Sequence, residues 1–137
     1  GYTYSGHPVA CAVALANIGI IEDEKLVQRT HDETGPHLAR RLAQLAEHPI
    51  VGEVRSLGLI GALEMVKDKA TRTHFDDLGA TGTLCRDHCL EGGLVLRAVR
   101  DVMVMSPPLS ITTAEIDRMI DILREALDRT AKEVGVG

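Results

Sequence analysis

Hydroxyl-bearing and small residues gather at the very start of the chain, directly before an apolar segment. The first eight residues are Gly-Tyr-Thr-Tyr-Ser-Gly-His-Pro, and the segment that follows is rich in Ala, Val and Ile. Pro8 suits the first turn of a helix, where its missing N–H leaves no hydrogen bond unmade. The hydroxyls of Thr3 and Ser5, beside free N–H groups at the positive end of a helix, suit a phosphate or a carboxylate. The pattern indicates either an anion site or an ordinary helix cap. Because a protein rarely begins inside its own binding motif, we expect the natural chain to extend upstream.

The three cysteines form neither a metal-binding nor a disulfide pattern. Cys85 and Cys89 are four residues apart in a predicted helix, and Cys11 lies in the opening helix. There is no Cys-x-x-Cys motif, and His88 beside Cys89 does not complete a four-ligand zinc set. We therefore expect no metal site, and we expect reduced, partly buried thiols in a cytoplasmic protein.

Composition places the chain among ordinary globular proteins. Its 137 residues fit one domain, with 45% hydrophobic and 26% charged residues. Aromatic residues make up only 2% of the chain, so the core must be aliphatic. The chain also offers few aromatic rings on which the bases of a single-stranded nucleic acid could stack. The net charge is −5, and the basic residues are mixed with acidic ones. The composition therefore predicts no nucleic-acid partner. No apolar run reaches membrane-spanning length and no signal peptide is visible, so no membrane association is expected.

The hydrophobic periodicity predicts the order helix–helix–strands–helix–hairpin–helix. Residues 8–21 form an apolar helix, and a helix that is apolar nearly all round is buried or lies between two bodies. A long helix over 23–47 should kink at Gly35-Pro36, because proline removes a backbone hydrogen bond. The other predicted elements are strands at 51–55 and 57–66, a helix over 79–91, a hairpin of 94–98 and 102–105 with its turn at 99–101, and a last helix.

Two local signals refine this outline. Thr112 and Glu115 form a capping box at the start of the last helix, which carries one apolar stripe. Gly58 and Gly61 mark a turn, a bulge or the close approach of another backbone. The whole pattern predicts an α+β fold, with a small, mainly antiparallel sheet covered by helices.

Four motifs in this order then identify a family that the chain resembles. They are G-Y-T-Y-S-G-H-P-V-A-C-A-V-A, V-R-S-L-G-L-I-G-A-L-E, G-T-L-C-R-D, and G-L-V-L-R-A followed by S-P-P-L. Together they resemble the C-terminal part of class III pyridoxal-phosphate-dependent aminotransferases, of the ω-amino acid:pyruvate type, over essentially the whole chain. The resemblance implies a fold-type-I enzyme. Residues 1–22 would end the large cofactor-binding domain, residues 23–48 would form a connecting helix, and residues 49–137 would form the small C-terminal α+β domain.

The resemblance also implies roles for particular residues. Thr3, the threonine of the G-Y-T motif, would bind the phosphate of pyridoxal 5'-phosphate in the neighbouring subunit of a homodimer, with help from the N–H of Tyr2. Arg97, the arginine of V-L-R-A, would bind the substrate carboxylate and swing away when the substrate is an uncharged amine. Arginine suits this task because its planar fork holds a carboxylate in a bidentate way and stays charged.

Several nearby residues have plainer interpretations. An arginine in a strand commonly faces solvent, so Arg97 could simply be a solvent-exposed residue. Arg100 is a nearby alternative for the carboxylate-binding role, but it lies in the predicted turn. His7 is interpreted as structural, holding the entry to the first helix, and Arg55 is also interpreted as structural. Met103 and Met105, at alternate strand positions, are predicted to belong to the core.

The residue that would carry the chemistry is not in this chain. The family requires a lysine that bonds covalently to the cofactor, upstream of the G-Y-T motif. The candidates Lys25, Lys67, Lys69 and Lys132 lie in charged, exposed contexts. We therefore assign no catalytic residue and predict that the 137-residue chain alone is inactive.

Two other functions remain open at this stage. The first is another class III reaction on the same cofactor, such as that of an aminomutase, racemase or decarboxylase. The second is a non-catalytic α+β binding module. Substrate profiling distinguishes the first function from an aminotransferase that acts on small amines and keto acids. A large upstream domain that carries the cofactor-binding lysine would distinguish an aminotransferase from the binding module.

Overall fold

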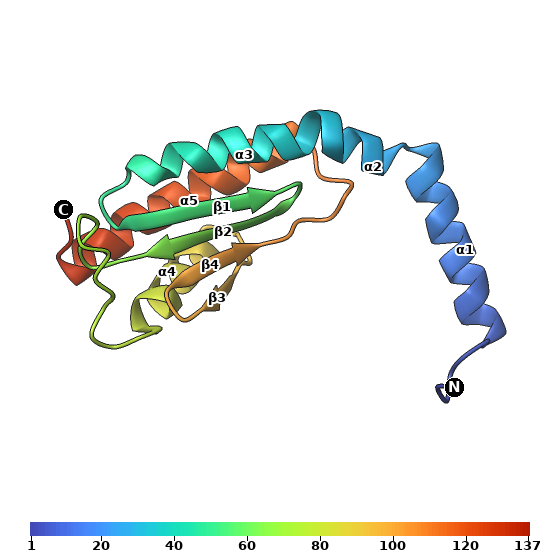
Figure 1. Ribbon diagram of the computed structural model, residues 1–137, viewed down its shortest axis with the longest axis horizontal. Helices are drawn as coiled ribbons and strands as arrows, with labels where there is room; N and C mark the ends of the chain where they lie inside the picture. The colour runs from blue at the N-terminus through green and yellow to red at the C-terminus, as the bar shows by residue number, and fades with distance from the viewer.

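A computed structural model describes all residues 1–137 as a projecting N-terminal helix joined to a sheet that is backed by helices (Figure 1). The elements, in chain order, are α1 (Pro8–Asp23), α2 (Leu26–Arg29), the π-helix η1 (Thr30–Thr34), α3 (Gly35–Ala43), the 3₁₀ helix η2 (Gln44–Glu47), β1 (Val51–Leu57), β2 (Ile60–Met65), α4 (Ala80–Glu91), β3 (Arg97–Val99), β4 (Val102–Met105) and α5 (Thr113–Val134).

The sheet has four strands in the order β1-β2-β4-β3, and all neighbouring strands are antiparallel. This confirms the predicted α+β class. The boundary between the first two strands was predicted wrongly, because Leu57 belongs to β1 and the second strand begins at Ile60. Gly58 has a φ of 56°, in the left-handed region that glycine tolerates, so the chain turns there. Gly61 marks a close approach, since a Cβ there would lie 2.9 Å from the Cγ of Met105.

The predicted long helix over 23–47 is a succession of four short helical segments. The chain first breaks at Lys25, which has a φ of 50°. The expected kink at Gly35-Pro36 takes the form of a π-helix, in which the Gly35 N–H donates to the Thr30 carbonyl. Pro36 has no N–H to donate to the carbonyl four residues earlier, so the usual hydrogen-bond ladder is interrupted there.

The core is aliphatic, as the composition predicted, and it lies between the sheet and helices α3, α4 and α5. Twelve large side chains in it are almost completely buried: Leu38, Leu42, Leu45, Ile50, Leu63, Met65, Met103, Met105, Ile116, Ile120, Leu123 and Leu127. Thr112 and Glu115 form the predicted capping box at the start of α5, so that helix begins where the sequence indicates.

The cysteines are free, and two of the three are buried. Cys85 and Cys89 lie in the core on one face of α4, whereas Cys11 is exposed, so the prediction of partly buried thiols is wrong for Cys11. A hydrogen bond from Cys89 lowers the pKa of the Cys85 thiol, and the same pairing raises the pKa of Cys89.

Helix α1 extends away from the rest of the molecule, and none of its residues is buried (Figure 1). Large apolar side chains on it, including Val9, Val13, Leu15, Ile18 and Ile20, are exposed. The sequence predicts that a helix of this composition is buried or lies between two bodies, and the burying surface is not provided by this chain. None of the helices is both long enough and apolar enough to cross a membrane.

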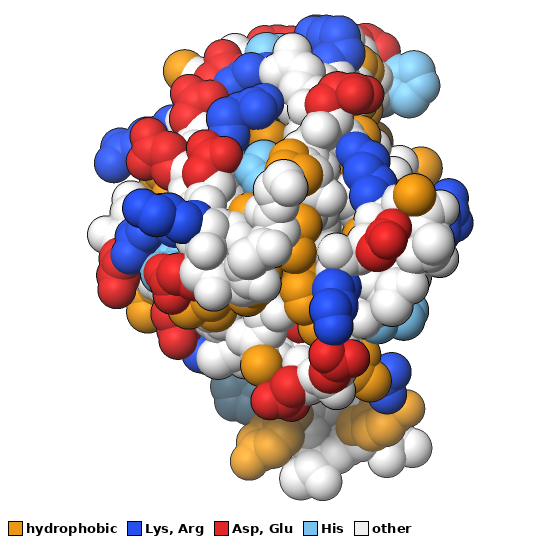
Figure 2. Space-filling view, turned by 90° about the vertical axis from the view of Figure 1, so that its left-hand side faces the viewer, with side chains coloured by type: hydrophobic (Ala, Val, Ile, Leu, Met, Phe, Trp, Pro, Cys, Tyr) orange, Lys and Arg blue, Asp and Glu red, His pale blue; other side chains and the backbone are white.

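Charges of both signs are mixed on the surface. Figure 2 shows acidic and basic side chains interspersed over the end of the molecule opposite α1, without a broad patch of either sign. This face therefore lacks the continuous basic surface on which duplex nucleic acids bind.

Candidate functional site

Arg97 lies at the start of β3, the edge strand of the sheet, with an exposed side chain. It lines a groove of about 870 Å³, the walls of which come from the segment 93–96, the end of β4, the loop 106–111 and the first half of α5. Half of the lining residues are hydrophobic. The groove thus joins the guanidiniums of Arg97 and Arg118 to an apolar surface, an arrangement suited to a small molecule with a carboxylate and an alkyl chain.

The hairpin that carries Arg97 is fixed to α4 by a buried carboxylate. Asp101, only 3% exposed, accepts hydrogen bonds from the Gly79 N–H at 3.1 and 3.2 Å and from the Gly82 N–H at 2.9 Å. A carboxylate at the positive end of a helix is stabilising and satisfies two orphan N–H groups. Asp101 was not predicted as a structural residue from the sequence. Its only local signal was an aspartate in a turn, which does not indicate a distant helix as its partner.

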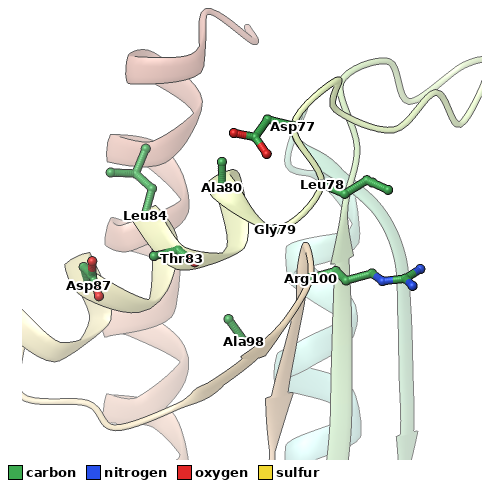
Figure 3. Close-up of a pocket in the computed structure, with 9 residues that line it drawn as sticks. All are labelled: Asp77, Leu78, Gly79, Ala80, Thr83, Leu84, Asp87, Ala98 and Arg100. Atoms are coloured by element: carbon green, nitrogen blue, oxygen red, sulfur yellow. The ribbon is translucent and has the colours of Figure 1, made fainter.

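Arg100, the nearby alternative to Arg97, lies in the hairpin turn with a φ of 53°. It lines a separate open hollow beside the start of α4 (Figure 3). The Arg100 side chain points away from α4 in this view. Asp101 already occupies the N–H groups of Gly79 and Gly82 beside this hollow, so these two groups are not free to bind a ligand.

The loop 106–111, which forms one wall of the groove, is held by an arginine from the connecting region. Nη2 of Arg29 donates to the carbonyls of Leu109 and Ile111, each at 3.0 Å. One guanidinium thus bridges α2 and the loop that follows β4. No local pattern in the sequence indicates this contact, because the residues that it joins are about eighty positions apart.

The N-terminal segment presents donors suited to a phosphate. Thr3 and Tyr2 are exposed, and the first turn of α1 contains no acidic residue. His7 caps the helix, since its Nδ1 accepts from the Ala10 N–H at 3.5 Å, which supports its interpretation as structural. The Tyr2 N–H donates to Oγ of Ser5 at 3.2 Å, so it would have to exchange that partner for a phosphate. A hydroxyl beside a helix N-terminus free of carboxylates fits a dianion.

These candidate residues do not form one site within a single chain. Figure 1 shows the N-terminal segment at the far end of α1, remote from β3. The remaining candidates lie elsewhere: Met103 and Met105 are core residues, as predicted, while Arg55 is exposed on β1. All four lysines, Lys25, Lys67, Lys69 and Lys132, are exposed. No group of three or more His, Cys, Asp or Glu side chains is arranged to hold a metal ion.

Helix α5 is fixed to its neighbours by pairs of histidines and carboxylates. Asp117 Oδ1 lies 2.8 Å from Nε2 of His37 and 2.7 Å from Nε of Arg41, both on α3. The hydrogen bond from His37 holds the pKa of Asp117 below its usual value of 3.8, and the charge of Arg41 adds to this effect. Further pairs join His48 to Asp128 at 3.1 Å and His88 to Glu133 at 2.9 Å.

Comparison with known proteins agrees with this arrangement. A family model described as aminotransferase class-III matches residues 1–127. A putrescine–pyruvate aminotransferase of Pseudomonas aeruginosa is 52% identical over 134 residues, which are 98% of this chain and 29% of the relative. A mitochondrial gamma aminobutyrate transaminase 1 of Solanum lycopersicum is 40% identical over 134 residues, 98% of this chain and 26% of the relative.

Solved structures give the same result. The omega transaminase from Pseudomonas jessenii, in a complex with PMP, superposes with a TM-score of 0.94 at 39% identity, over 100% of this chain and 30% of that one. The antiparallel sheet with its helices is thus a domain of a fold-type-I transaminase. The chain belongs to the class-III aminotransferases, whose members depend on pyridoxal phosphate. It spans about 29% of the length of the putrescine–pyruvate relative.

Proposed function

We propose that this chain is the C-terminal portion of an aminotransferase that moves an amino group from an amine or an ω-amino acid to a keto acid such as pyruvate. The observation that carries the proposal is the exposed Arg97 in a half-apolar groove, on an edge strand of a class-III domain. The name of the 52% identical relative, a putrescine–pyruvate aminotransferase, supports this choice of donor and acceptor.

In that reaction, Arg97, Thr3 and Tyr2 have binding roles. When bound, pyridoxal phosphate supplies the electron sink that allows the amino group to be transferred from the donor to the keto acid. Arg97 orients the keto acid by a bidentate pair with its carboxylate, and the apolar lining of the groove excludes water from that pair. The Thr3 hydroxyl and the Tyr2 N–H hold the cofactor phosphate, with the positive end of α1 beside them.

The proposed assembly is a homodimer in the cytoplasm. The N-terminal segment, which carries Thr3, lies at the far end of α1 from the sheet that carries Arg97, in line with the neighbouring-subunit role that the family resemblance implies for Thr3. The uncovered apolar surface of α1 supports such an association. Three free cysteines, with no disulfide, are consistent with a reducing compartment.

The test is to replace Arg97 with Ala in an aminotransferase of full family length that carries this chain. Loss of a buried charged pair costs roughly 2–5 kcal/mol, so kcat/KM for pyruvate should fall by about 30-fold or more. The rate with an uncharged amine donor should change far less. Arg124→Ala is the matched control, because Arg124 is an arginine of α5 that does not line the groove. Equal losses with keto acid and amine would reject the role of Arg97.

A further inference from the structure

The loop 106–111 supplies a large part of the groove but has few attachments to the rest of the chain. Five of the sixteen lining residues belong to it: Ser106, Pro107, Pro108, Ser110 and Ile111. Its one internal backbone hydrogen bond runs from the Ile111 N–H to the Pro108 carbonyl at 3.0 Å. The only hydrogen bonds that join the loop to another part of the chain are the two that Nη2 of Arg29 donates to its carbonyls. The position of this wall therefore depends on Arg29.

Arg29 is directed at the loop by the π-helix that follows it. It ends α2, a helix of only 4 residues that Lys25, with a φ of 50°, separates from α1. In η1 the Gly35 N–H donates to the carbonyl of Thr30, five residues earlier. Each residue of an α-helix turns the chain by about 100° around the helix axis, so a π-helical turn gives Arg29 another angle to α3 than a continuous α-helix would.

The packing at η1 is costly, which indicates that it is kept for its geometry. Nε of Arg29 and the hydroxyls of Thr30 and Thr34 are buried without a hydrogen-bond partner in the chain. Thr34 is only 1% exposed. Such groups are uncommon in proteins, because each gives up its hydrogen bonds to water and receives none in return. Single π-helical turns occur mainly at functional sites.

The C-terminal end of η1 is nevertheless fixed to the small domain. Gly35 is buried against the turn between β1 and β2, and a Cβ at Gly35 would lie 3.2 Å from the Cα of Gly58. This close approach of two backbones anchors the π-helix on the sheet. Arg29 thus extends from a fixed base to a loop that has no other anchor.

We propose that Arg29 is a positioning residue, which together with the π-helix η1 holds the loop 106–111 in the conformation that binds the substrate. Arg29 does not line the groove, so it acts through the carbonyls of Leu109 and Ile111. The proposal rests on the proposed function, in which the keto acid occupies this groove. A wall that is held in advance need not be ordered when the substrate arrives, so the loss of Arg29 weakens binding more than the chemical step.

The first measurement follows the loop itself by hydrogen exchange and mass spectrometry, on the full-length, cofactor-loaded aminotransferase that carries this chain. In Arg29→Ala the Ile111 N–H should exchange at least about tenfold faster, because the loop loses its anchor. The Thr112 N–H is the internal control, since it donates to Oε2 of Glu115 at 2.8 Å and should keep its rate. Arg40→Ala is the matched variant, because Arg40 is exposed and pairs with His37 on its own helix.

The second measurement is the effect on catalysis by the same variants. We expect the KM for pyruvate to rise about fivefold to tenfold in Arg29→Ala, with kcat within about twofold of the unmodified enzyme. Arg29→Lys should recover part of the loss, because an ammonium group also donates to carbonyls but lacks the planar fork. Arg40→Ala should change neither constant.

Three results would each overturn the proposal: an unchanged exchange rate of Ile111 in Arg29→Ala, faster exchange with an unchanged KM, or a lower kcat and thermal midpoint at an unchanged KM. The last of these is the result of a merely structural role. The exchange measurement involves no substrate, so it separates this proposal from the one on which it rests. If Arg97→Ala has no selective effect on pyruvate, the proposed function fails, whereas faster exchange in Arg29→Ala still shows that Arg29 holds the loop.

Discussion

Gly82 has no room for a side chain. A Cβ built there would lie 1.9 Å from the carbonyl oxygen of Arg100, which is a backbone atom and cannot turn aside. Gly82→Ala should therefore separate α4 from the hairpin and weaken the Asp101 hydrogen bonds. We expect a loss of about 3 kcal/mol, at the upper end of the cost of overpacking. Urea unfolding measures it, with Gly19→Ala as control, since nothing lies within 4 Å of a Cβ at Gly19. An unfolding free energy equal to that of the unmodified chain would show that the hairpin shifts to accommodate the methyl group without loss of stability.

The sequence predicted individual residues best where their roles depend on neighbours in the chain. The capping pair Thr112 and Glu115 needs no distant partner, and it is confirmed. At Gly58 the sequence left a turn, a bulge or a close approach open, and the structure has a turn. Asp101 was missed, because the N–H groups that it accepts from belong to a helix about twenty residues earlier. The assignments of Arg97, Thr3 and Tyr2 came from the family resemblance, and they stay predictions.

Helix α5 is held to α3 by a contact that depends on pH. The hydrogen bond from His37, aided by Arg41, keeps the pKa of Asp117 below 3.8. A carboxyl with a depressed pKa contributes stability above its unfolded pKa and loses it as pH falls through the folded value. Asp117→Asn should thus lower the urea midpoint near pH 6, and the difference from the unmodified chain should shrink below about pH 4. A difference that stays constant down to pH 2 would assign the effect to packing instead. Asp23→Asn, at the end of the uncovered helix α1, is the matched control.

Boundaries of the elements were less predictable than their types. The types of α4, α5 and the β3–β4 hairpin were predicted correctly, but the first strand of the hairpin was predicted at 94–98, whereas β3 spans Arg97–Val99. The connecting region has a hydrophobic repeat throughout, so it was predicted as one kinked helix. Its real division at Lys25 and at the π-helix depends on a left-handed residue and on the missing N–H of Pro36. Neither of these features changes the hydrophobic pattern.

The molecule as a whole consists of a packed small domain and a helix without a partner. The domain closes its own core between the sheet and helices α3 to α5. Helix α1 has no buried residue and exposes its apolar side chains, so the part of the molecule that would hold Thr3 at a cofactor is not fixed by contacts within this chain. The N-terminal segment assigned to the phosphate therefore depends on surfaces beyond those that the small domain provides. This agrees with a chain that spans about 29% of the length of a close relative.

The four lysines give the final prediction. A lysine that bonds to pyridoxal phosphate must lose its proton, and burial in an apolar pocket or a nearby cation favours that loss. Here Lys67 instead pairs with Asp76 at 2.7 Å, Lys69 donates to the carbonyl of Ala46, and Lys25 and Lys132 are exposed. When the 137-residue chain is mixed with pyridoxal phosphate, reduced with borohydride and examined by mass spectrometry, we expect no stoichiometric adduct and no turnover of amine with pyruvate. Scattered labelling of several lysines at low yield is the expected background of exposed amines. A single lysine labelled to completion would mean that this chain has its own covalent cofactor site, and the division of labour proposed for the full-length enzyme would then be wrong.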